Sequence, residues 1–358
     1  MSTEKQVQSI LDEAVKAYPG AGMQFCAIKD DQCIVSACAG FTSEKMDKKV
    51  EEHTLFPVYS TSKSVPATAL SRLIAKGKIS PDQPVTDIWP EFGKSGKETT
   101  LVRHLLNHTS GLPQRFKEQT SYEIVCDWES MIRAIENAPC DWVPGTQARY
   151  QSLTYGWVTM ELIQRVTGMS FKEYIAKELG LTDDGDFIFG TTDETEKRIS
   201  DFRLADGHAK SSSFSVCDPI DDLMQQKCIR RAVLPGFNGF ASAYGLASFM
   251  NRVNNCDFFS RRILKDATSP EYSPAKDNPV KGSTKIFGYG YALTGPAGDL
   301  GKFYGHGGYG GSEAIADRDN NVTCGFTTNI LCAAEDIKFE LFKYFGIEPR
   351  LNWKEAEA

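Results

Sequence analysis

The chain has 358 residues, of which 41% are hydrophobic and 24% are charged, and its formal net charge is −7. This balance is typical of a globular enzyme and excludes a disordered chain, while the length suggests two packed units or one unit with an insertion. The acidic charge argues against nucleic acid or an anionic membrane as the main partner.

The N-terminus is polar and charged, without a basic region followed by an apolar run, so the sequence predicts no secretion signal. No window of about 18 apolar residues occurs, which predicts no membrane span. The ten cysteines are scattered and form no C-x-x-C pair. We expect them to be reduced and mostly buried, and we expect the protein to be cytoplasmic.

The first elements predicted along the chain are a helix and a hairpin. Residues 5–17 place apolar side chains on one helical face, and Pro19 and Gly20 end that helix. Two β-rich runs follow at 23–28 and 33–37, separated by turn-forming residues, and they predict a β-hairpin.

The middle of the chain, residues 60–281, has a mainly helical pattern with long polar connections. The last part of the chain returns to strands and closes with an amphipathic helix. The predicted helices of the middle block cover 64–76, 130–137, 153–167 and 241–253. The predicted late elements are strands at 286–293, 301–304, 312–316 and 322–329, and a helix at 333–344.

We therefore predict an α+β fold. An antiparallel sheet is formed by both chain ends and flanked by helices, and a mainly helical domain is inserted between them. The sheet domain is expected to comprise residues 1–59 and 282–358, and the helical domain residues 60–281.

Ser60 and Lys63 are a candidate nucleophile and base. Side chains three residues apart on a helix lie on the same side. A serine needs an adjacent base to take its proton, and a lysine is that base only if its pKa is lowered. The same spacing recurs at Ser2–Lys5 and Ser273–Lys276, but only Ser60 opens a convincing helix. Taken alone, the pair also fits an N-cap serine beside a solvated lysine.

Further motifs favour the catalytic interpretation. They read RHLLNHTSGLP at 103–113, PGTQARYQSLTYGW at 144–157 and GHGG at 305–308. Together with YSTSK at 59–63, their order and separation resemble the serine β-lactamase-like family. That family includes AmpC-type β-lactamases, DD-peptidases, family VIII carboxylesterases and lovastatin-type acyltransferases. The resemblance extends from about residue 20 to residue 330.

The resemblance implies roles for individual residues. Ser60 matches the nucleophile, Lys63 its paired base and Tyr150 the tyrosine of a Y-x-N/S motif. The backbone N–H groups of Ser60 and Tyr309 would form the oxyanion hole. Without the resemblance, Tyr150 is an ordinary core or surface aromatic. His108 is expected to be structural, tying a loop beneath the site.

Four residues are implied to bind substrate. Ser152 stands where β-lactamases commonly carry asparagine, and His306, Gly307 and Gly308 stand where they usually carry Lys-Thr-Gly. On its own, His306 could equally be a packed strand histidine. Replacing lysine by His306 removes a permanent cation, which disfavours penicillin-like carboxylates and favours an uncharged ester, thioester or amide.

The predicted function is a carboxylesterase-like serine hydrolase that acts on a small-molecule ester or amide through an acyl-enzyme. One alternative is an acyltransferase that passes the acyl group to an alcohol or amine. Others are β-lactamase or DD-peptidase activity and a catalytically silent scaffold. Five histidines without paired spacing predict no metal site, and no cofactor is expected. The oligomeric state stays open.

Overall fold

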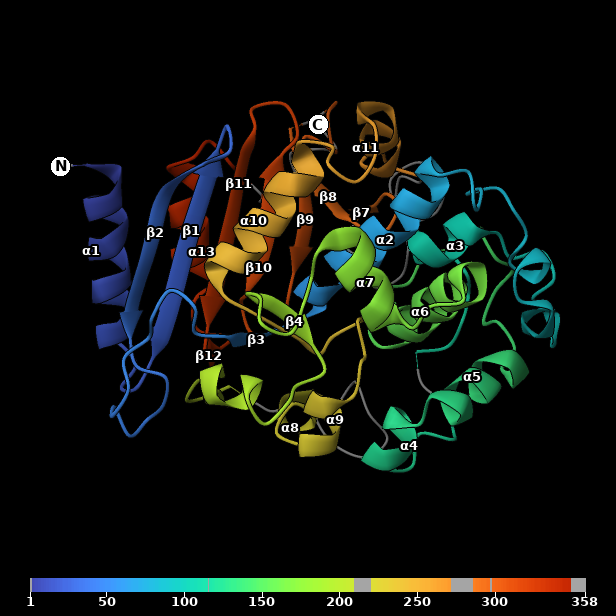
Figure 1. Cartoon of the computed structure of the whole chain (residues 1–358), viewed down its shortest axis with the longest axis horizontal. Coiled ribbons are helices and arrows are strands. Elements are labelled where there is room, and N and C mark those ends of the chain that lie inside the picture. The colour runs from blue at the N-terminus through green and yellow to red at the C-terminus, as the bar shows by residue number, and fades with distance from the viewer. Residues whose placement is uncertain (1, 115, 209–219, 272–285, 297, 349–358) are drawn as a thin grey trace.

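A computed structural model describes residues 2–114, 116–208, 220–271, 286–296 and 298–348. Figure 1 shows a long sheet on one side of the molecule and a cluster of helices on the other. Three features of the sequence lie outside the described residues: Cys217, the Ser273–Lys276 spacing and the predicted domain boundary at residue 281.

Both ends of the chain contribute to one seven-stranded sheet with the order β2-β1-β11-β10-β9-β8-β7. Every neighbouring pair in it is antiparallel. Strand β1 lies against β11, with Phe25 opposite Phe326, so the first hairpin joins the late strands. The predicted antiparallel sheet is confirmed. The strands are β1 (Gly22–Lys29), β2 (Gln32–Gly40), β7 (Ile286–Phe287), β8 (Ala292–Thr294), β9 (Phe303–Gly307), β10 (Glu313–Asp317) and β11 (Val322–Thr328).

Helices cover both faces of this sheet (Figure 1). Helices α1 (Thr3–Lys16) and α13 (Glu335–Lys343) pack on one face, where Phe25 lies 6.2 Å from Phe342 between ring centroids. Helix α10 (Ala243–Asn254) packs on the other face. A Cβ at Gly325 would come within 2.2 Å of a backbone oxygen of α10, so the helix and β11 are in very close contact.

The remaining helices form the block that carries the site, and α2 contacts α6 and α7 at its centre. Two small sheets join this block to the rest: β3-β6-β4 and the parallel pair β12-β5. The helices are α2 (Ser64–Ala75), α3 (Val102–Leu106), α4 (Tyr122–Cys126), α5 (Trp128–Asn137), α6 (Thr154–Thr167), α7 (Phe171–Leu179), α8 (Ile220–Leu223), α9 (Lys227–Arg231) and α11 (Arg261–Ala267). The short strands are β3 (Phe56–Tyr59), β4 (Phe187–Phe189), β5 (Arg203–Leu204), β6 (Gly239–Ala241) and β12 (Ile330–Leu331).

Two details differ from the sequence-based expectation. The single strand predicted at 286–293 is a tight hairpin, because Gly290 has a φ of +87° and the chain reverses between β7 and β8. Helix α10 falls within the predicted helical domain, yet it packs against the sheet. The division into two domains stays a prediction.

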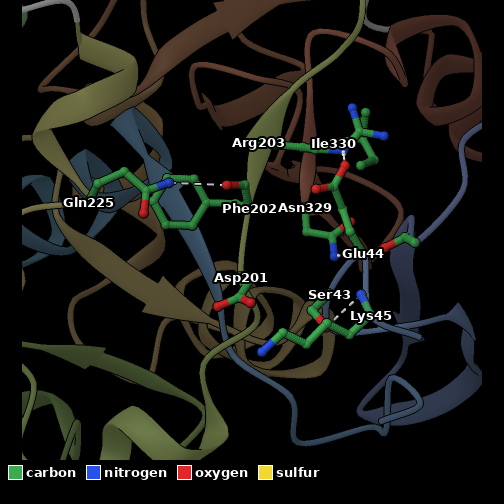
Figure 2. A pocket seen from close by; sticks show the side chains of 10 residues that line it. Ser43, Glu44, Lys45, Asp201, Phe202, Arg203, Gln225, Asn329 and Ile330 are labelled. Carbon is green, nitrogen blue, oxygen red and sulfur yellow. Dashed lines mark hydrogen bonds and ion pairs between the residues drawn. The ribbon is translucent and has the colours of Figure 1, made fainter. Parts of the chain in front are cut away.

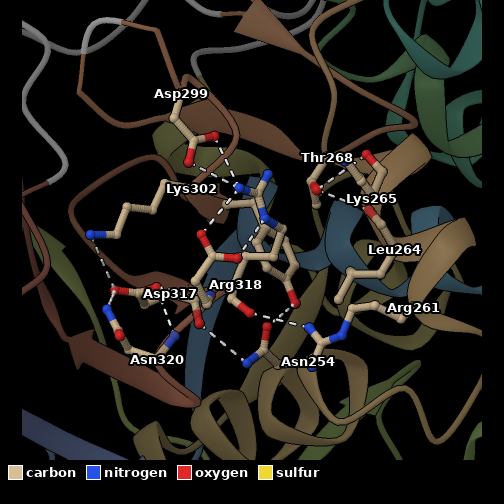
Figure 3. Close-up of polar contacts among 12 residues, drawn as sticks. Asn254, Arg261, Leu264, Lys265, Thr268, Asp299, Lys302, Asp317, Arg318 and Asn320 are labelled. Atoms are coloured by element: carbon tan, nitrogen blue, oxygen red, sulfur yellow. Dashed lines mark hydrogen bonds and ion pairs between the residues drawn. The ribbon is translucent and has the colours of Figure 1, made fainter.

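A polar network closes the end of the sheet where β10 turns into β11 (Figure 3). The buried Asp317 accepts hydrogen bonds from the backbone N–H groups of Asp319 and Asn320. Arg318 donates to both carboxylate oxygens of Asp299 at 3.0 Å. Strand β10 runs from Glu313 to Asp317. The network fixes its Asp317 end, which is the end farther from the GHGG motif.

Within the described ranges, no helix is both long enough and apolar enough to cross a lipid bilayer.

Candidate active site

Ser60 lies at a sharp junction between strand and helix. Strand β3 ends at Tyr59, a 3-10 turn covers Ser60–Lys63, and α2 begins at Ser64. Tyr59 has φ 44° and ψ −127°, a backbone conformation that costs energy for any residue except glycine. The buried Tyr59 ring is held against the rings of Phe202 and Tyr309, at centroid distances of 6.5 Å and 5.5 Å. The packing therefore maintains a strained turn directly before the candidate nucleophile.

Lys63 is fully buried and lies within hydrogen-bond distance of Ser60, with 3.2 Å between Nζ and Oγ. Its Nζ also donates to the carbonyl oxygens of Ser152, at 2.7 Å, and of Gly236. A neutral amine has two N–H bonds and one lone pair. If the two carbonyl oxygens accept those N–H bonds, the lone pair is left facing the Ser60 hydroxyl, which is the arrangement that a general base requires.

Tyr150 is the third predicted catalytic residue, and it lies beside Ser60 and Lys63. Its hydroxyl is buried, and its ring centroid lies 5.0 Å from Lys63 Nζ. Burial raises the pKa of Tyr150 above its ordinary value, and the polar Ser60 side chain opposes this shift. The phenol is therefore protonated at neutral pH and can donate a proton. The structure brings the three predicted catalytic side chains together at one point.

His108 holds the segment that carries Tyr150. Its carbonyl oxygen accepts the N–H of Arg149 at 3.0 Å, and its Nδ1 accepts the N–H of Gln151 at 3.2 Å. The two residues that flank Tyr150 are thus both hydrogen-bonded to His108, whose ring also packs 5.0 Å from the Tyr150 ring. This geometry supports the structural role predicted for His108.

The GHGG segment lies beside this group, at the end of β9. The His306 ring is buried, 5.8 Å from the Tyr150 ring, and its Nδ1 is 2.7 Å from the carbonyl oxygen of Gly307. That carbonyl can only accept a hydrogen bond, so the proton of a neutral His306 is assigned to Nδ1. Phe287 stacks on Tyr150 at 5.7 Å and lies 6.1 Å from His306.

The turn after β9 is joined closely to the turn of the nucleophile. A Cβ at Gly308 would lie 2.1 Å from the carbonyl oxygen of Val58, so only glycine fits there. The carbonyl of Ser312 accepts hydrogen bonds from Gly308 N at 2.7 Å and from Thr61 Oγ1 at 3.1 Å. The backbone amide of Tyr309, expected in the oxyanion hole, therefore belongs to a turn that is tied to the turn carrying Ser60.

Two residues contribute to the site in a way that the sequence did not predict. Ser152 binds Lys63 through its main-chain carbonyl, and contact of its hydroxyl with substrate stays a prediction. Gly236 binds Lys63 in the same way, and its Leu-Pro-Gly context in the sequence predicts only an interruption of regular structure. A carbonyl acceptor leaves no side-chain signal in a sequence, so neither contact could have been found there.

A separate hollow of about 400 Å³ lies near the β1–β2 hairpin (Figure 2). None of Ser60, Lys63 and Tyr150 lines it. One of its lining residues, Phe202, packs its ring against the ring of Tyr59. Its lining consists of Gly20, Ser43, Glu44, Lys45, Asp201, Phe202, Arg203, Gln225, Asn329 and Ile330.

No group of three or more His, Cys, Asp or Glu side chains is arranged to hold a metal ion in the part of the chain that the structure describes.

Comparison with known proteins agrees with the fold and the motifs. The family model described as Beta-lactamase matches residues 7–337. The chain is a serine hydrolase by class, as predicted. It belongs to the beta-lactamase family.

Three known proteins are similar to this chain in sequence or in fold. "Esterase/beta-lactamase LipL" of Mycobacterium tuberculosis is 27% identical over 305 residues, which cover 76% of this chain and 69% of that relative. A solved family VIII carboxylesterase superimposes with a TM-score of 0.81 at 22% identity, covering 95% of this chain and 98% of that one. A structure described as "EstCE1, a hydrolase with promiscuous acyltransferase activity" gives a TM-score of 0.77 at 16% identity, covering 95% and 97%.

Proposed function

We propose that the protein is a carboxylesterase-like hydrolase in which Ser60 attacks the carbonyl of an uncharged small-molecule ester or amide. The observation that carries this proposal is the distance of 3.2 Å between Ser60 Oγ and Lys63 Nζ, with the Tyr150 ring centroid 5.0 Å from the same Nζ. The name esterase given to LipL, and the fold shared with a family VIII carboxylesterase, support the same substrate class.

The proposed first step forms an acyl-enzyme. The Ser60 Oγ attacks the carbonyl carbon while its proton passes to the neutral amine of Lys63. The carbonyl oxygen becomes an oxyanion that accepts hydrogen bonds from the backbone amides of Ser60 and Tyr309. One such donor is commonly worth about 3–4 kcal/mol of transition-state stabilisation.

The second part of the step releases the alcohol or amine. As the bond from the carbonyl carbon to the leaving group breaks, the phenol of Tyr150 gives its proton to the leaving atom. The ammonium of Lys63 then returns a proton to Tyr150, which restores both groups. Because burial raises the pKa of Tyr150, the phenol is protonated at neutral pH and is able to donate its proton to the leaving group. Water then attacks the acyl carbon while Lys63 takes one of its protons. The bond from the acyl carbon to Ser60 Oγ breaks, Lys63 returns the proton to Oγ, and the carboxylic acid leaves.

His306 supports an uncharged substrate. A histidine at this position supplies no permanent cation for a substrate carboxylate, and Gly307 supplies no hydroxyl. Weak β-lactamase activity is therefore the less favoured alternative. Transfer of the acyl group to an alcohol or amine uses the same acyl-enzyme, and the description of EstCE1 supports it as the second candidate.

A short-chain p-nitrophenyl ester tests the proposal. We expect hydrolysis by the wild-type protein and none above background with Ser60→Ala. Ser64→Ala is the matched control, since Ser64 is also a buried serine of the same segment and its hydroxyl has no role in the mechanism. Equal activity of Ser60→Ala and wild type would contradict the proposal. Adding an alcohol and measuring the new ester separates transfer from hydrolysis.

The cytoplasmic location and the lack of a nucleic-acid partner remain predictions from the sequence.

A further inference from the structure

Two cysteines of the first hairpin have their sulfur atoms in contact. Cys26 lies on β1 and Cys33 on β2, and their Sγ atoms are 3.8 Å apart. The register pairs Cys26 with Ser36 and Ile28 with Cys33, with an irregularity between Ala27 and Ile28. The two cysteines are therefore diagonal neighbours on one face of the hairpin, and their side chains turn toward each other so that the sulfur atoms meet.

The two thiols differ in their access to solvent. Cys26 is 1% exposed and packs with Ile28, Ala243 and Ala247 between β1 and α10. Cys33 is exposed. A reagent in solution therefore meets Cys33 first, and Cys26 lies directly behind it. The nine cysteines within the described ranges are all free, so both thiols are available for oxidation.

The contact between the two sulfur atoms also shifts the pKa values of the two thiols in opposite directions. The hydrogen bond from Cys26 lowers the pKa of Cys33 to about 7, while the same bond raises the pKa of Cys26. Burial and the nearby carboxylate of Glu52 oppose the shift at Cys33. Glu52 also accepts a hydrogen bond from the Ser36 hydroxyl at 2.6 Å, which engages one of its oxygens. A thiolate is the reactive form of cysteine, so the exposed member of the pair is also the more reactive one.

We propose that Cys33 and Cys26 form a peroxide-sensitive thiol pair, in which Cys33 is oxidised first and Cys26 resolves it into a cross-strand disulfide. In the first step the Cys33 thiolate attacks one oxygen of hydrogen peroxide, the O–O bond breaks, and Cys33 becomes a sulfenic acid as hydroxide leaves. In the second step the Cys26 sulfur attacks the Cys33 sulfur, the S–O bond breaks, and water leaves after the thiol proton is transferred. Overall two thiols lose two electrons and two protons, and one peroxide becomes two waters.

This site is separate from the Ser60 chemistry. Strand β2 is the edge of the large sheet, and β1, β11 and β10 lie between it and the β9 strand that carries His306. Figure 1 shows the hairpin at the edge of the sheet that lies away from the helical block. Oxidation of the pair is expected to leave ester hydrolysis unchanged.

Peroxide treatment followed by mass spectrometry tests the proposal. After a stoichiometric amount of hydrogen peroxide, the wild-type chain should lose the mass of two hydrogen atoms, and peptide mapping should join Cys26 to Cys33. Cys26→Ser should instead accumulate a sulfenic acid on Cys33 that reacts with dimedone. Cys33→Ser should show neither product. Cys38→Ser is the matched control on the same strand and should form the disulfide as wild type does.

Each other outcome overturns the proposal. These outcomes are no disulfide in the wild type, a disulfide that joins other cysteines, or equal oxidation of Cys33→Ser and wild type. Circular dichroism and p-nitrophenyl ester hydrolysis of each variant establish that it is folded before oxidation.

Discussion

The hydroxyl of Thr61 donates a hydrogen bond of 3.1 Å to the carbonyl oxygen of Ser312, and it thereby joins the turn of the nucleophile to the turn after β9. Thr61 is fully buried, so water cannot replace this bond. Because the two expected oxyanion donors, Ser60 and Tyr309, belong to these two turns, the bond controls their separation.

Thr61→Val removes that hydrogen bond and keeps the shape of the side chain. We expect kcat to fall by roughly tenfold to 100-fold with little change in KM, since misplaced oxyanion donors weaken binding of the transition state more than binding of the substrate. Steady-state kinetics with a p-nitrophenyl ester measures this. Thr61→Ser, which keeps the hydroxyl, should restore most of the activity. A fall in kcat of the same size in both variants would argue against the hydrogen bond as the cause.

Lys63→Met should reduce kcat/KM by about 10³-fold or more, because it removes the amine to which the proposed mechanism transfers the Ser60 proton. It also leaves the buried carbonyls of Ser152 and Gly236 without this donor, at a cost of about 1–3 kcal/mol for each. Both the rate and the free energy of unfolding should fall, and urea titration measures the second. Loss of stability without loss of rate would give Lys63 a purely structural role.

Tyr150→Phe should lower kcat by roughly 100-fold or more, because the leaving group loses its proton donor. Burial raises the pKa of Tyr150, so ionisation of this phenol should cause no fall in wild-type activity below about pH 10. A pH–rate profile measures both effects. Unchanged activity of Tyr150→Phe would exclude the phenol from the mechanism.

The same pKa shift affects stability in alkali. Above about pH 10 the unfolded phenol loses its proton while the folded phenol of Tyr150 keeps it, so the folded state binds more protons and the free energy of unfolding falls as pH rises. Denaturant titrations at several alkaline pH values should give a smaller fall for Tyr150→Phe than for wild type. An identical pH dependence would contradict the shift.

Gly308→Ala should destabilise the protein or prevent its folding, because the new Cβ would lie 2.1 Å from the carbonyl oxygen of Val58. Gly307→Ala is its matched control for stability, since its Cβ would meet Glu313 at an ordinary distance of 3.5 Å. Thermal unfolding compares the two variants. A similar loss of melting temperature in both would mean that the close approach of the two turns is not what requires glycine.

The large sheet could be predicted from the sequence because its strands have strong local signals. The hairpin of β1 and β2 has β-rich runs around a turn of polar residues, and β10 and β11 repeat that pattern. The packing of α10 on β11 could not be predicted, because it depends on contacts between segments distant in sequence, such as Gly325 with Ala243.

The sequence predicted the catalytic side chains of the candidate site but not the backbone features that hold them. Ser60, Lys63 and Tyr150 were recognised through motif order, and the structure brings them together. The strained backbone of Tyr59 and the carbonyl of Gly236 that binds Lys63 have no side-chain signature, so a sequence does not reveal them.

The intact mass of the protein after brief incubation with an acyl donor, followed by peptide mapping, shows whether Ser60 is the nucleophile. We expect one acyl group, located on Ser60, in the wild type and in Ser64→Ala, and none in Ser60→Ala. An acyl group on another residue, or an equal amount of it in Ser60→Ala, would mean that Ser60 is not the nucleophile.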